Sequence, residues 1–347
     1  MGGKEMKGLV KQGNTLQLMD VNEPVCQDDK VKVEVKYTGI CGTDLHIYHN
    51  EFEVTDSIII GHEMSGEVVE IGKNIKNLTI GDRVTVLPSN YYTCQECEFC
   101  EKGLYTLCRV RKGMGLHVNG GFTQYVVVRE DMCYKIPDHI TYEVAAMSEP
   151  LAVVTQPIEE LADITREDVV LVTGPGPIGL LATYVLVNKG CKVLVAGTSS
   201  DTERLKIAKE IGCTRTIDVL TEDLKAIVKE ETNGIGVNVV VECSGSNQAI
   251  KSGINVLKNT GTFLQVGVIG KDIQIDFDSV LYKQLNVKGS IGHGISTWDK
   301  VIQILENSKG DLEKIITHRF PLSRWEEAFK VCEARKGAKV LIYNDYI

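Results

Sequence analysis

Four cysteines near residue 100 are the residues of this chain best suited to a chemical role. They stand in the pattern C-x2-C-x2-C-x7-C, at Cys94, Cys97, Cys100 and Cys108. Four thiolates in so short a segment suit one tetrahedral Zn²⁺, held by a compact lobe at about residues 90–110. Four protein ligands leave no position for water, so this zinc is expected to be structural. A disulfide pair or a cluster of unbound thiols is the alternative.

A second group of possible metal ligands precedes the cysteine lobe. Cys41, His62 and Glu63 offer a soft, a borderline and a hard ligand. This mixture suits a catalytic Zn²⁺ that keeps one exchangeable position. Glu149 follows at the expected junction of two domains, where a cleft would form. A single histidine or glutamate is usually a solvated residue, but two clustered motifs just before a cysteine lobe favour a metal site.

A glycine-rich turn, Gly174-Pro175-Gly176-Pro177-Ile178-Gly179, has the pattern G-x-G-x-x-G. It follows the apolar run VVLVT and opens the helical run IGLLATYVLV. In that context the first glycine permits a tight turn, the second lets a pyrophosphate approach the backbone, and the third brings helix and strand together. The helix N-terminus then offers unpaired N–H groups to the phosphates. The turn therefore predicts a dinucleotide site; a turn without a ligand is the alternative.

The end of the following strand predicts which dinucleotide is preferred. A site selective for NAD usually shows Asp or Glu about twenty residues after the glycines. Here Thr198, Ser199 and Ser200 stand at that place, and the first acid is Asp201. Small hydroxyl residues leave room for a 2′-phosphate, and Arg204 could pair with it. The sequence thus favours NADP over NAD, with Arg204 as an ordinary solvated helix residue as the alternative.

The metal ligands and the glycine-rich turn lie in parts of the chain with different sequence patterns, so we expect them in different domains. A chain of 347 residues is long enough to form two domains, each with its own hydrophobic core. Up to about residue 150 the chain reads as short strands, including 31–37, 65–71 and 83–87, with a turn at Gly81-Asp82. From Asp168 fully apolar strands alternate with amphipathic helices, which is typical of βαβ units and a parallel sheet. Helices near 298–307 and 324–335 end the chain. The prediction is a β-rich domain, a doubly wound α/β domain and a short C-terminal return.

Composition excludes several classes of function. Hydrophobic residues make up 43% and charged residues 24% of the chain, and the net charge of −9 disfavours nucleic acid as a partner. The first residues, Met1–Lys7, lack the apolar stretch of a secretory signal, and no apolar run is long enough for a bilayer span. We therefore expect a cytoplasmic protein without a membrane partner. In that reducing compartment its 11 cysteines serve as ligands or buried small residues rather than disulfides.

Taken together, the motifs resemble the zinc-dependent medium-chain alcohol dehydrogenase family, in particular its sorbitol (polyol) and threonine dehydrogenase branch. The resemblance covers essentially the whole chain, in family order: GICGTDLHIY, GHEMSGEVVEIG, GDRV, CQECEFCEKGLYTLC, GGFTQYVVV, SEPLAV, GPGPIG and ITHRFPL. It implies an α/β protein with a GroES-like catalytic domain at 1–152, a Rossmann domain at 153–289 and a C-terminal return at 290–347. It also implies a homotetramer or homodimer.

The resemblance also implies roles for the metal ligands. Cys41, His62 and Glu63 match ligands of a catalytic zinc, and Glu149 matches the acid that binds or approaches that metal. The four cysteines of the lobe match the structural zinc. One catalytic and one structural Zn²⁺ per chain are therefore expected, with NADP or NAD as the second cofactor.

The implied reaction is transfer of a hydride between NAD(P) and a secondary alcohol of a polyol, diol or sugar derivative. Zinc lowers the pKa of the substrate hydroxyl in such a reaction. Thr43 matches the hydroxyl that passes the proton on, and His46 is a plausible continuation of that relay. Asp44 matches a residue that orients the ligand His62.

The chain departs from the family in two places. His293 and Gly294 stand where polyol enzymes usually offer an Arg-Tyr pair to substrate hydroxyls, and Val154-Thr155-Gln156 stands where relatives commonly carry a histidine. Both changes argue against sorbitol itself. The longer loop of the threonine enzymes is missing here, which argues against an amino-acid substrate. His293 is either a substrate contact or an ordinary surface or core histidine.

Other functions remain open from the sequence. A zinc-free, NADPH-dependent enzyme of the quinone-reductase type would lack the Cys41, His62 and Glu63 set, so zinc content discriminates it. An L-threonine 3-dehydrogenase-like enzyme shares most of the motifs. A binding protein that kept only the fold would show lost ligands or a damaged glycine loop, and the sequence shows neither.

Overall fold

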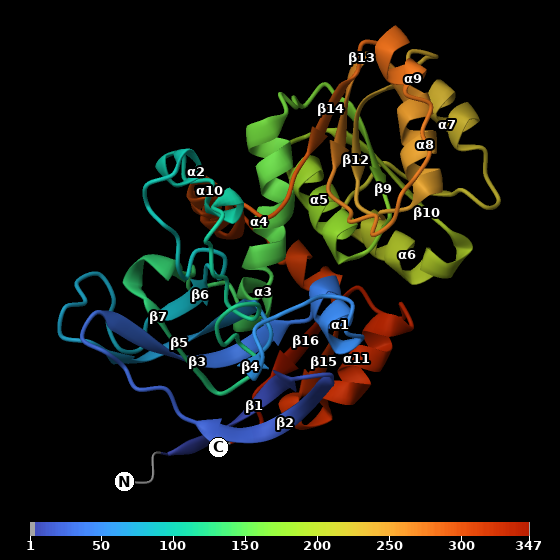
Figure 1. Cartoon of the computed structure of the whole chain (residues 1–347). Helices are drawn as coiled ribbons and strands as arrows, with labels where there is room; N and C mark the ends of the chain where they lie inside the picture. Colours follow the sequence, from blue (N-terminus) through green and yellow to red (C-terminus); the bar gives the residue numbers. More distant parts are fainter. Residues whose placement is uncertain (1–3, 347) are drawn as a thin grey trace. The chain divides into compact units, whose positions relative to one another are not determined.

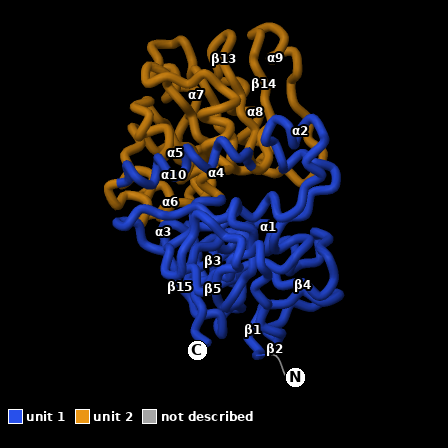
Figure 2. Tube along the Cα trace, turned by 90° about the vertical axis from the view of Figure 1, so that its left-hand side faces the viewer, with its two compact units in different colours: residues 1–149, 293–308, 316–347 blue, residues 150–292, 309–315 orange. Residues whose placement is uncertain are grey.

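The computed structural model describes residues 4–346 and divides the chain into two compact units. Unit 1 comprises residues 1–149, 293–308 and 316–347, and unit 2 comprises residues 150–292 and 309–315 (Figure 2). The domain bounds expected from the sequence, 1–152, 153–289 and 290–347, stay a prediction, because packing units need not coincide with family domains. Residues 1–3, on which the absence of a leader partly rests, lie outside the described residues.

Unit 1 is built on two largely antiparallel sheets (Figure 1). The larger has seven strands in the order β15-β16-β3-β5-β6-β8, with β7 paired to β3, and only β15 and β16 run parallel. The smaller has the order β2-β1-β4. The strands are β1 (Glu5–Gln12), β2 (Thr15–Asn22), β3 (Lys30–Gly39), β4 (Ile58–Ile59), β5 (Glu63–Ile71), β6 (Arg83–Val86), β7 (Tyr125–Arg129), β8 (Cys133–Lys135), β15 (Ile316–Pro321) and β16 (Lys339–Tyr343).

Alternating side chains explain how the larger sheet forms. In β3 the valines at 31, 33 and 35 are buried, and they pack against Met64, Val68 and Val126 of the neighbouring strands. One face of the strand is therefore apolar while the charged residues between the valines point the other way. The strands expected at 31–37, 65–71 and 83–87 are present as β3, β5 and β6.

Short helices connect the strands of unit 1, and two longer helices come from the C-terminal return. The α-helices are α1 (Gly42–Tyr48), α2 (Glu98–Glu101), α3 (Tyr142–Ala145), α10 (Ile295–Glu306) and α11 (Trp325–Glu333). Helix α4 (Ser148–Gln156) begins in unit 1 and continues into unit 2. The 3₁₀ helices are η1 (Tyr105–Leu107), η2 (Glu130–Met132) and η6 (Leu322–Arg324). The expected C-terminal helices are thus α10 and α11. Trp325 and Phe329 of α11 pack into one core with Phe122 and with Ile47 of α1.

Unit 2 is a doubly wound α/β unit. Its six parallel strands have the order β11-β10-β9-β12-β13-β14. Numbered within the unit this order is 3-2-1-4-5-6, that of the Rossmann fold. The strands are β9 (Val169–Thr173), β10 (Lys192–Gly197), β11 (Arg215–Asp218), β12 (Val237–Glu242), β13 (Leu257–Gln265) and β14 (Asn286–Gly289). The fold is therefore mixed α/β, as predicted: a GroES-like antiparallel part and a parallel Rossmann sheet.

The helices of unit 2 cover this sheet, which lies between α5 and the pair α7 and α8 in Figure 1. Ile227 and Val228 of α7 and Ile254 of α8 share a buried core with Leu171 and Val240 of the central strands. The helices are α5 (Pro177–Asn188), α6 (Thr202–Glu210), α7 (Leu224–Glu231), α8 (Asn247–Val256) and α9 (Asp278–Tyr282), with η3 (Pro157–Leu161), η4 (Ser199–Asp201) and η5 (Asp311–Ile315). Within residues 4–346, none of these or the other helices is long and apolar enough to cross a membrane.

Candidate active site

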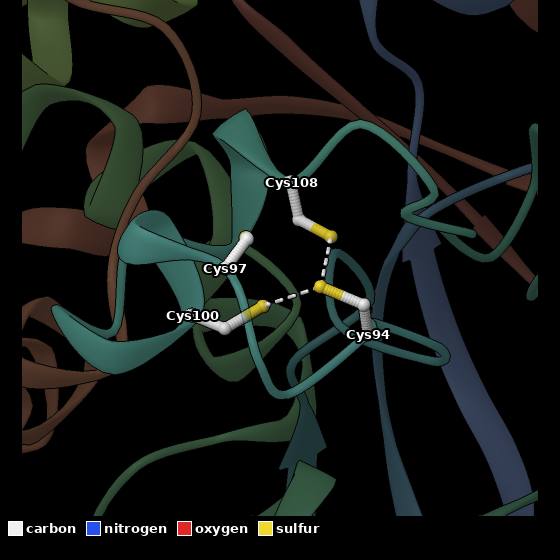
Figure 3. Close-up of side chains that lie close together, drawn as sticks. All are labelled: Cys94, Cys97, Cys100 and Cys108. Atoms are coloured by element: carbon white, nitrogen blue, oxygen red, sulfur yellow. Dashed lines mark hydrogen bonds between the residues drawn. The ribbon is translucent and has the colours of Figure 1, made fainter.

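The four cysteines of the lobe come together around one point (Figure 3). The Sγ atom of Cys94 lies 3.8 Å from that of Cys100 and 3.6 Å from that of Cys108. A tetrahedral zinc with Zn–S bonds of about 2.3 Å spaces its sulfur atoms by about 3.8 Å. A disulfide would need about 2.05 Å, and all the cysteines are free thiols. The spacing therefore fits a zinc site and argues against the disulfide alternative.

The local backbone prepares some of these thiols to lose their protons. The backbone N–H of Cys94 lowers the pKa of the Cys108 thiol to about 7, and the backbone N–H of Cys100 lowers that of Cys97. Burial, in contrast, raises the pKa of Cys100 to about 11. Zinc binds cysteine only as the thiolate. The positive charge of the metal must therefore outweigh the effect of burial on Cys100 before that thiol loses its proton.

Cys41, His62 and Glu63 form the second cluster, and one ligand atom from each lies within 4.8 Å of the others. Cys41 is the N-cap residue of α1, Glu63 is the first residue of β5, and His62 immediately precedes it. The start of a helix and the start of a strand therefore bring together residues that are about twenty positions apart. The glutamate is fully buried, and the other two are partly exposed.

Buried polar atoms in this cluster lack partners. Among residues 4–346, neither Nδ1 of His62 nor Oδ1 of Asp44 has a hydrogen bond. The Oε2 oxygen of Glu63 is paired with the ammonium group of Lys339. Buried polar groups are normally satisfied, so each such atom needs an explanation. A divalent cation held by Cys41, His62 and Glu63 would fix the ring of His62 and would share the Glu63 carboxylate with Lys339. The residues present thus fit a zinc ion.

The carboxylate of Asp44 faces the ring of the expected ligand His62. Its Oδ1 lies 3.8 Å from Nδ1 of His62, and its Oδ2 accepts a hydrogen bond of 2.8 Å from the backbone N–H of Cys41. Because Nδ1 faces Asp44, Nε2 is left to serve as the metal ligand. Asp44 is completely buried, and burial raises its pKa. A nearby cation would supply the positive charge that keeps this carboxylate ionised.

Lys339 is a residue of the site that the sequence analysis did not single out. Its ammonium group forms an ion pair with the Glu63 carboxylate and donates a hydrogen bond of 3.0 Å to the carbonyl of Ile40. Burial opposes its charge, but the anionic groups of Glu63, Cys41 and Glu149 outweigh it, so the pKa of Lys339 lies above its ordinary value. One signal was available: a lysine opens the otherwise apolar strand Lys339–Tyr343.

Glu149 lies outside the cluster of three but near it. Its Oε1 lies 3.3 Å from Nε2 of the buried His293. Burial opposes ionisation of Glu149, but contact with His293 and the charges of His62 and Lys339 outweigh it, so its pKa lies below the ordinary value. An ionised carboxylate is therefore available beside the metal ligands. The sequence analysis had left the role of His293 open.

Thr43 and His46 both lie on α1, directly after Cys41. The hydroxyl of Thr43 is 3.7 Å from the Cys41 sulfur, which places it at the metal cluster. His46 is exposed, and its Nδ1 lies 2.6 Å from Oε2 of Glu51. It stands one helical turn after Thr43, on the solvent side of α1. The two residues keep their expected roles as predictions.

The glycine-rich turn of unit 2 has the geometry that a dinucleotide needs. Gly174 adopts φ +85°, which only glycine does without strain. A Cβ on Gly179 would lie 1.9 Å from the carbonyl oxygen of Gly174, so helix α5 can approach the turn only without a side chain there. A Cβ on Gly176 would meet nothing within 4 Å. The backbone at this point is open to a ligand, and Pro177 and Ile178 begin α5.

Two carboxylates hold the loop after β10, one from the loop itself and one from the end of β11. Asp201 accepts hydrogen bonds from the backbone N–H and hydroxyl of Thr198, at 3.1 and 2.8 Å, and its other oxygen lies 3.5 Å from the Arg204 guanidinium. The Ser199 hydroxyl donates to Asp218 at 2.5 Å, and that of Ser200 lies 2.7 Å from Thr198. The hydroxyl residues and Arg204 thus lie close together, but the guanidinium of Arg204 already contacts a carboxylate, and its role towards a 2′-phosphate stays a prediction.

Comparison with known proteins matches two dehydrogenase domains to this chain. The alcohol dehydrogenase GroES-like domain matches residues 27–138, and the zinc-binding dehydrogenase domain matches residues 177–307. A sorbitol dehydrogenase of Halalkalibacterium halodurans is 38% identical over 97% of this chain and 99% of its own length. A D-arabitol-phosphate dehydrogenase of Enterococcus avium is 37% identical over 99% of this chain and 98% of its own. The chain belongs to the zinc-dependent medium-chain dehydrogenase family.

Solved structures of dehydrogenases match almost the full length of this chain. The 2R,3R-butanediol dehydrogenase of Bacillus subtilis has a TM-score of 0.88 at 30% identity, covering 98% of this chain and 100% of that one. A putative zinc-binding dehydrogenase of Sinorhizobium meliloti, bound to NADP, has a TM-score of 0.88 at 28% identity and covers 98% and 99%. A protein described as a short chain alcohol dehydrogenase of E. coli, complexed with NADH, has a TM-score of 0.87 at 28% identity and covers 98% of this chain and 100% of that one. The chain is therefore a zinc-dependent, NAD(P)-linked dehydrogenase.

In this dehydrogenase the pair of Lys339 and Glu63 should contribute strongly to stability. In the zinc-free protein we expect Lys339→Met to lower the free energy of unfolding of unit 1 by about 3–5 kcal/mol, because it leaves the buried Glu63 carboxylate without a cation. Urea unfolding followed by tryptophan fluorescence reports on this unit alone, since both tryptophans, Trp298 and Trp325, belong to it.

Lys36→Met is the matched control for this change. Lys36 lies in the same sheet and pairs with Glu34 at 2.8 Å, but both side chains are 32% exposed. Its loss should cost less than about 1 kcal/mol. Equal effects of the two substitutions would show that the pair with Glu63 is worth no more than a surface ion pair.

Proposed function

We propose that this dehydrogenase transfers a hydride between NAD(P) and a secondary alcohol of a polyol, diol or sugar derivative. The observation that carries this proposal is the cluster of Cys41, His62 and Glu63, whose ligand atoms all lie within 4.8 Å of one another. Such a set holds a catalytic metal rather than a structural one, because it leaves a position free. When bound, zinc acts as a Lewis acid on the oxygen of the alcohol.

The residues around that position transfer the proton and orient the metal ligands. Thr43, 3.7 Å from the Cys41 sulfur, is placed to accept the proton of the substrate hydroxyl and pass it towards solvent. His46, exposed on the same helix, supports the outer end of that relay. Asp44 holds the ring of His62 through its contact with Nδ1. Glu149 adds a negative charge and Lys339 a positive charge beside the metal ligands.

The experiment that tests this function combines a zinc count with a substrate screen. Metal analysis of the purified chain should find about two zinc ions. The reduction of NADP⁺ and of NAD⁺ is then followed with a panel of polyols and diols, and L-threonine is included as the alternative substrate. One zinc per chain would mean that only the cysteine lobe holds a metal. Together with reduction of quinones by NADPH, that result would instead support the reductase that has no catalytic zinc.

For the cofactor we propose NADP, with NAD as the alternative. Support comes from the hydroxyl residues at 198–200 and from Arg204 beside them. A 2′-phosphate would share the guanidinium with Asp201, which lies 3.5 Å from it. The ratio of KM values for the two cofactors in the same screen measures the preference, and a lower KM for NAD⁺ would reverse the assignment.

A phosphorylated polyol is a second candidate substrate, and Arg111 is the observation that favours it. This arginine is half-buried, yet within residues 4–346 its guanidinium has neither an ion pair nor a hydrogen bond. Burial lowers its pKa, and the negative charge of Glu149 acts against that. The same loop reaches the catalytic cluster, because Gly115 packs against Gly61, next to the ligand His62. A free guanidinium here suits a phosphate group.

Arg111→Gln should therefore raise the KM for a polyol monophosphate by about 10–100-fold, the effect of losing one or two hydrogen bonds to a charged group. The KM for the unphosphorylated polyol should not change. Arg109→Gln, an exposed arginine of the same loop, is the control. If Arg111→Gln affects both substrates equally, the arginine does not recognise a phosphate.

We also expect a homo-oligomer, a tetramer or a dimer. The edge strand β14 is exposed, and large apolar side chains near it are exposed as well. They are Val268, Phe277, Leu281, Tyr282, Val287 and Ile291. Exposed apolar groups of this kind usually mark an interaction surface. The molar mass in solution tests the expectation, and the free thiols support a reducing, cytoplasmic location.

A further inference from the structure

His293 is the buried titratable residue that the proposed reaction leaves unexplained. Its side chain has no solvent-exposed surface, so it is not placed to meet a substrate. Its backbone is tied to the cysteine lobe: the carbonyl accepts a hydrogen bond of 3.1 Å from the Thr106 hydroxyl. The next turn is tied to the lobe as well, since the N–H of Ile295 donates to the carbonyl of Gly103 at 3.3 Å. The backbone of this segment is therefore anchored to the cysteine lobe.

Trp298 decides which nitrogen of His293 carries the proton. The indole N–H of Trp298 donates a hydrogen bond of 2.9 Å to Nδ1 of His293. An indole nitrogen can only donate, so Nδ1 must be the acceptor, and the proton of the neutral ring sits on Nε2. Trp298 is itself completely buried and packs against Tyr134, with ring centroids 5.3 Å apart. Its N–H group therefore has a fixed direction.

The N–H on Nε2 faces Glu149. The distance from Nε2 to Oε1 of that residue is 3.3 Å, slightly long for a hydrogen bond, and within residues 4–346 Nε2 has no other hydrogen-bond partner. A small rotation of the Glu149 side chain would bring its carboxylate within ordinary hydrogen-bond distance of this buried donor. The chain Trp298, His293, Glu149 thus reaches from the core of unit 1 to the edge of the metal cluster.

We propose that His293, with its tautomer set by Trp298, is a positioning residue that holds the Glu149 carboxylate beside the catalytic metal ligands. This inference rests on the proposed function, because it concerns the same site. Its consequence is specific to this chain: Glu149 is restrained by a neutral N–H donor, which limits how far its carboxylate can move towards or away from the metal. Partners that orient residues around a metal typically change metal affinity or activity by about 10–100-fold when removed.

The test compares His293→Phe, which keeps a flat ring without a donor, with His293→Gln, whose amide can again donate to Glu149. We expect His293→Phe to release the more labile of the two zinc ions to a chelator about 10–100-fold faster and to lower kcat by a similar factor. His293→Gln should recover most of both losses. The visible spectrum of the cobalt-substituted protein should change in the first variant and not in the second.

His318→Gln, a half-buried histidine elsewhere in unit 1, is the control and should leave all three measurements unchanged. Trp298→Phe keeps His293 but removes the donor to Nδ1, so it should accelerate zinc release to a smaller extent. It also serves as the test if His293→Phe does not fold, as judged by circular dichroism. Equal behaviour of the Phe and Gln variants at His293, or unchanged zinc release in Trp298→Phe, would overturn the inference. An unsubstituted chain with one zinc would overturn the proposed function itself.

Discussion

Cys41→Ala is expected to lower turnover by at least about 10³-fold and to reduce the zinc content from about two ions per chain to about one. The thiolate is one of only three clustered ligands, so its loss leaves His62 and Glu63 to hold the metal alone. Lewis-acid catalysis supplies several kcal/mol of transition-state stabilisation, and each 1.36 kcal/mol corresponds to about a tenfold change in rate. Turnover of the best substrate and total zinc are the two measurements.

Cys26→Ala provides the control for that experiment. Cys26 lies in the same unit but outside both cysteine clusters, and its thiol donates to backbone carbonyls, the nearest being that of Lys30 at 3.3 Å. It should keep both zinc ions and full turnover. If Cys41→Ala retained turnover and lost no zinc, the second cluster would not be a metal site, and the zinc-free reductase would become the better explanation.

Cys100→Ser is expected to remove the other zinc and to open the cysteine lobe. The lobe contains only the short helices α2 and η1, and two of its own cysteines, Cys100 and Cys108, belong to its few buried side chains. A segment with so little apolar core depends on its metal for a fixed structure. Trypsin should therefore cleave after Lys102 and Arg109 at least about tenfold faster than in the unsubstituted chain.

Cys41→Ala is the reciprocal control, because it should lose the other zinc and keep the lobe resistant to trypsin. Turnover should also fall in Cys100→Ser, since Thr106 of the lobe holds the backbone of His293 at 3.1 Å. Unchanged cleavage at residues 102 and 109 after the zinc is lost would show that packing, not metal, maintains the lobe.

Much of the candidate site was readable from the sequence because its parts are local. The four lobe cysteines fall within residues 94–108, and the glycine turn occupies 174–179. In both, residues that act together are neighbours along the chain, so their spacing alone limits the geometry. The same holds for the element types: the valine alternation of β3 and the apolar strands of unit 2 carry their periods in the sequence.

The partners of the metal ligands were decided only by the tertiary structure. Lys339 reaches Glu63 because β16 and β5 both pair with β3: Gly39 lies opposite Leu341 on one side and opposite Glu63 on the other. A Cβ on Gly39 would lie 2.0 Å from the Glu63 carboxylate, so this glycine leaves the space in which the ion pair forms. The local sequence around Lys339 does not indicate that its partner is Glu63, which is 276 positions away in the chain.

The contact of His293 with Glu149 has the same origin. The two residues are far apart in the sequence, and the C-terminal return carries one of them back into unit 1 beside the other. The sequence by itself therefore determined the family, the fold class and the kinds of metal ligand, because short-range spacing and periodicity encode them. Which buried charges and hydrogen-bond donors surround those ligands depends on strand register and chain return, and these are set by long-range packing that local periodicity does not specify.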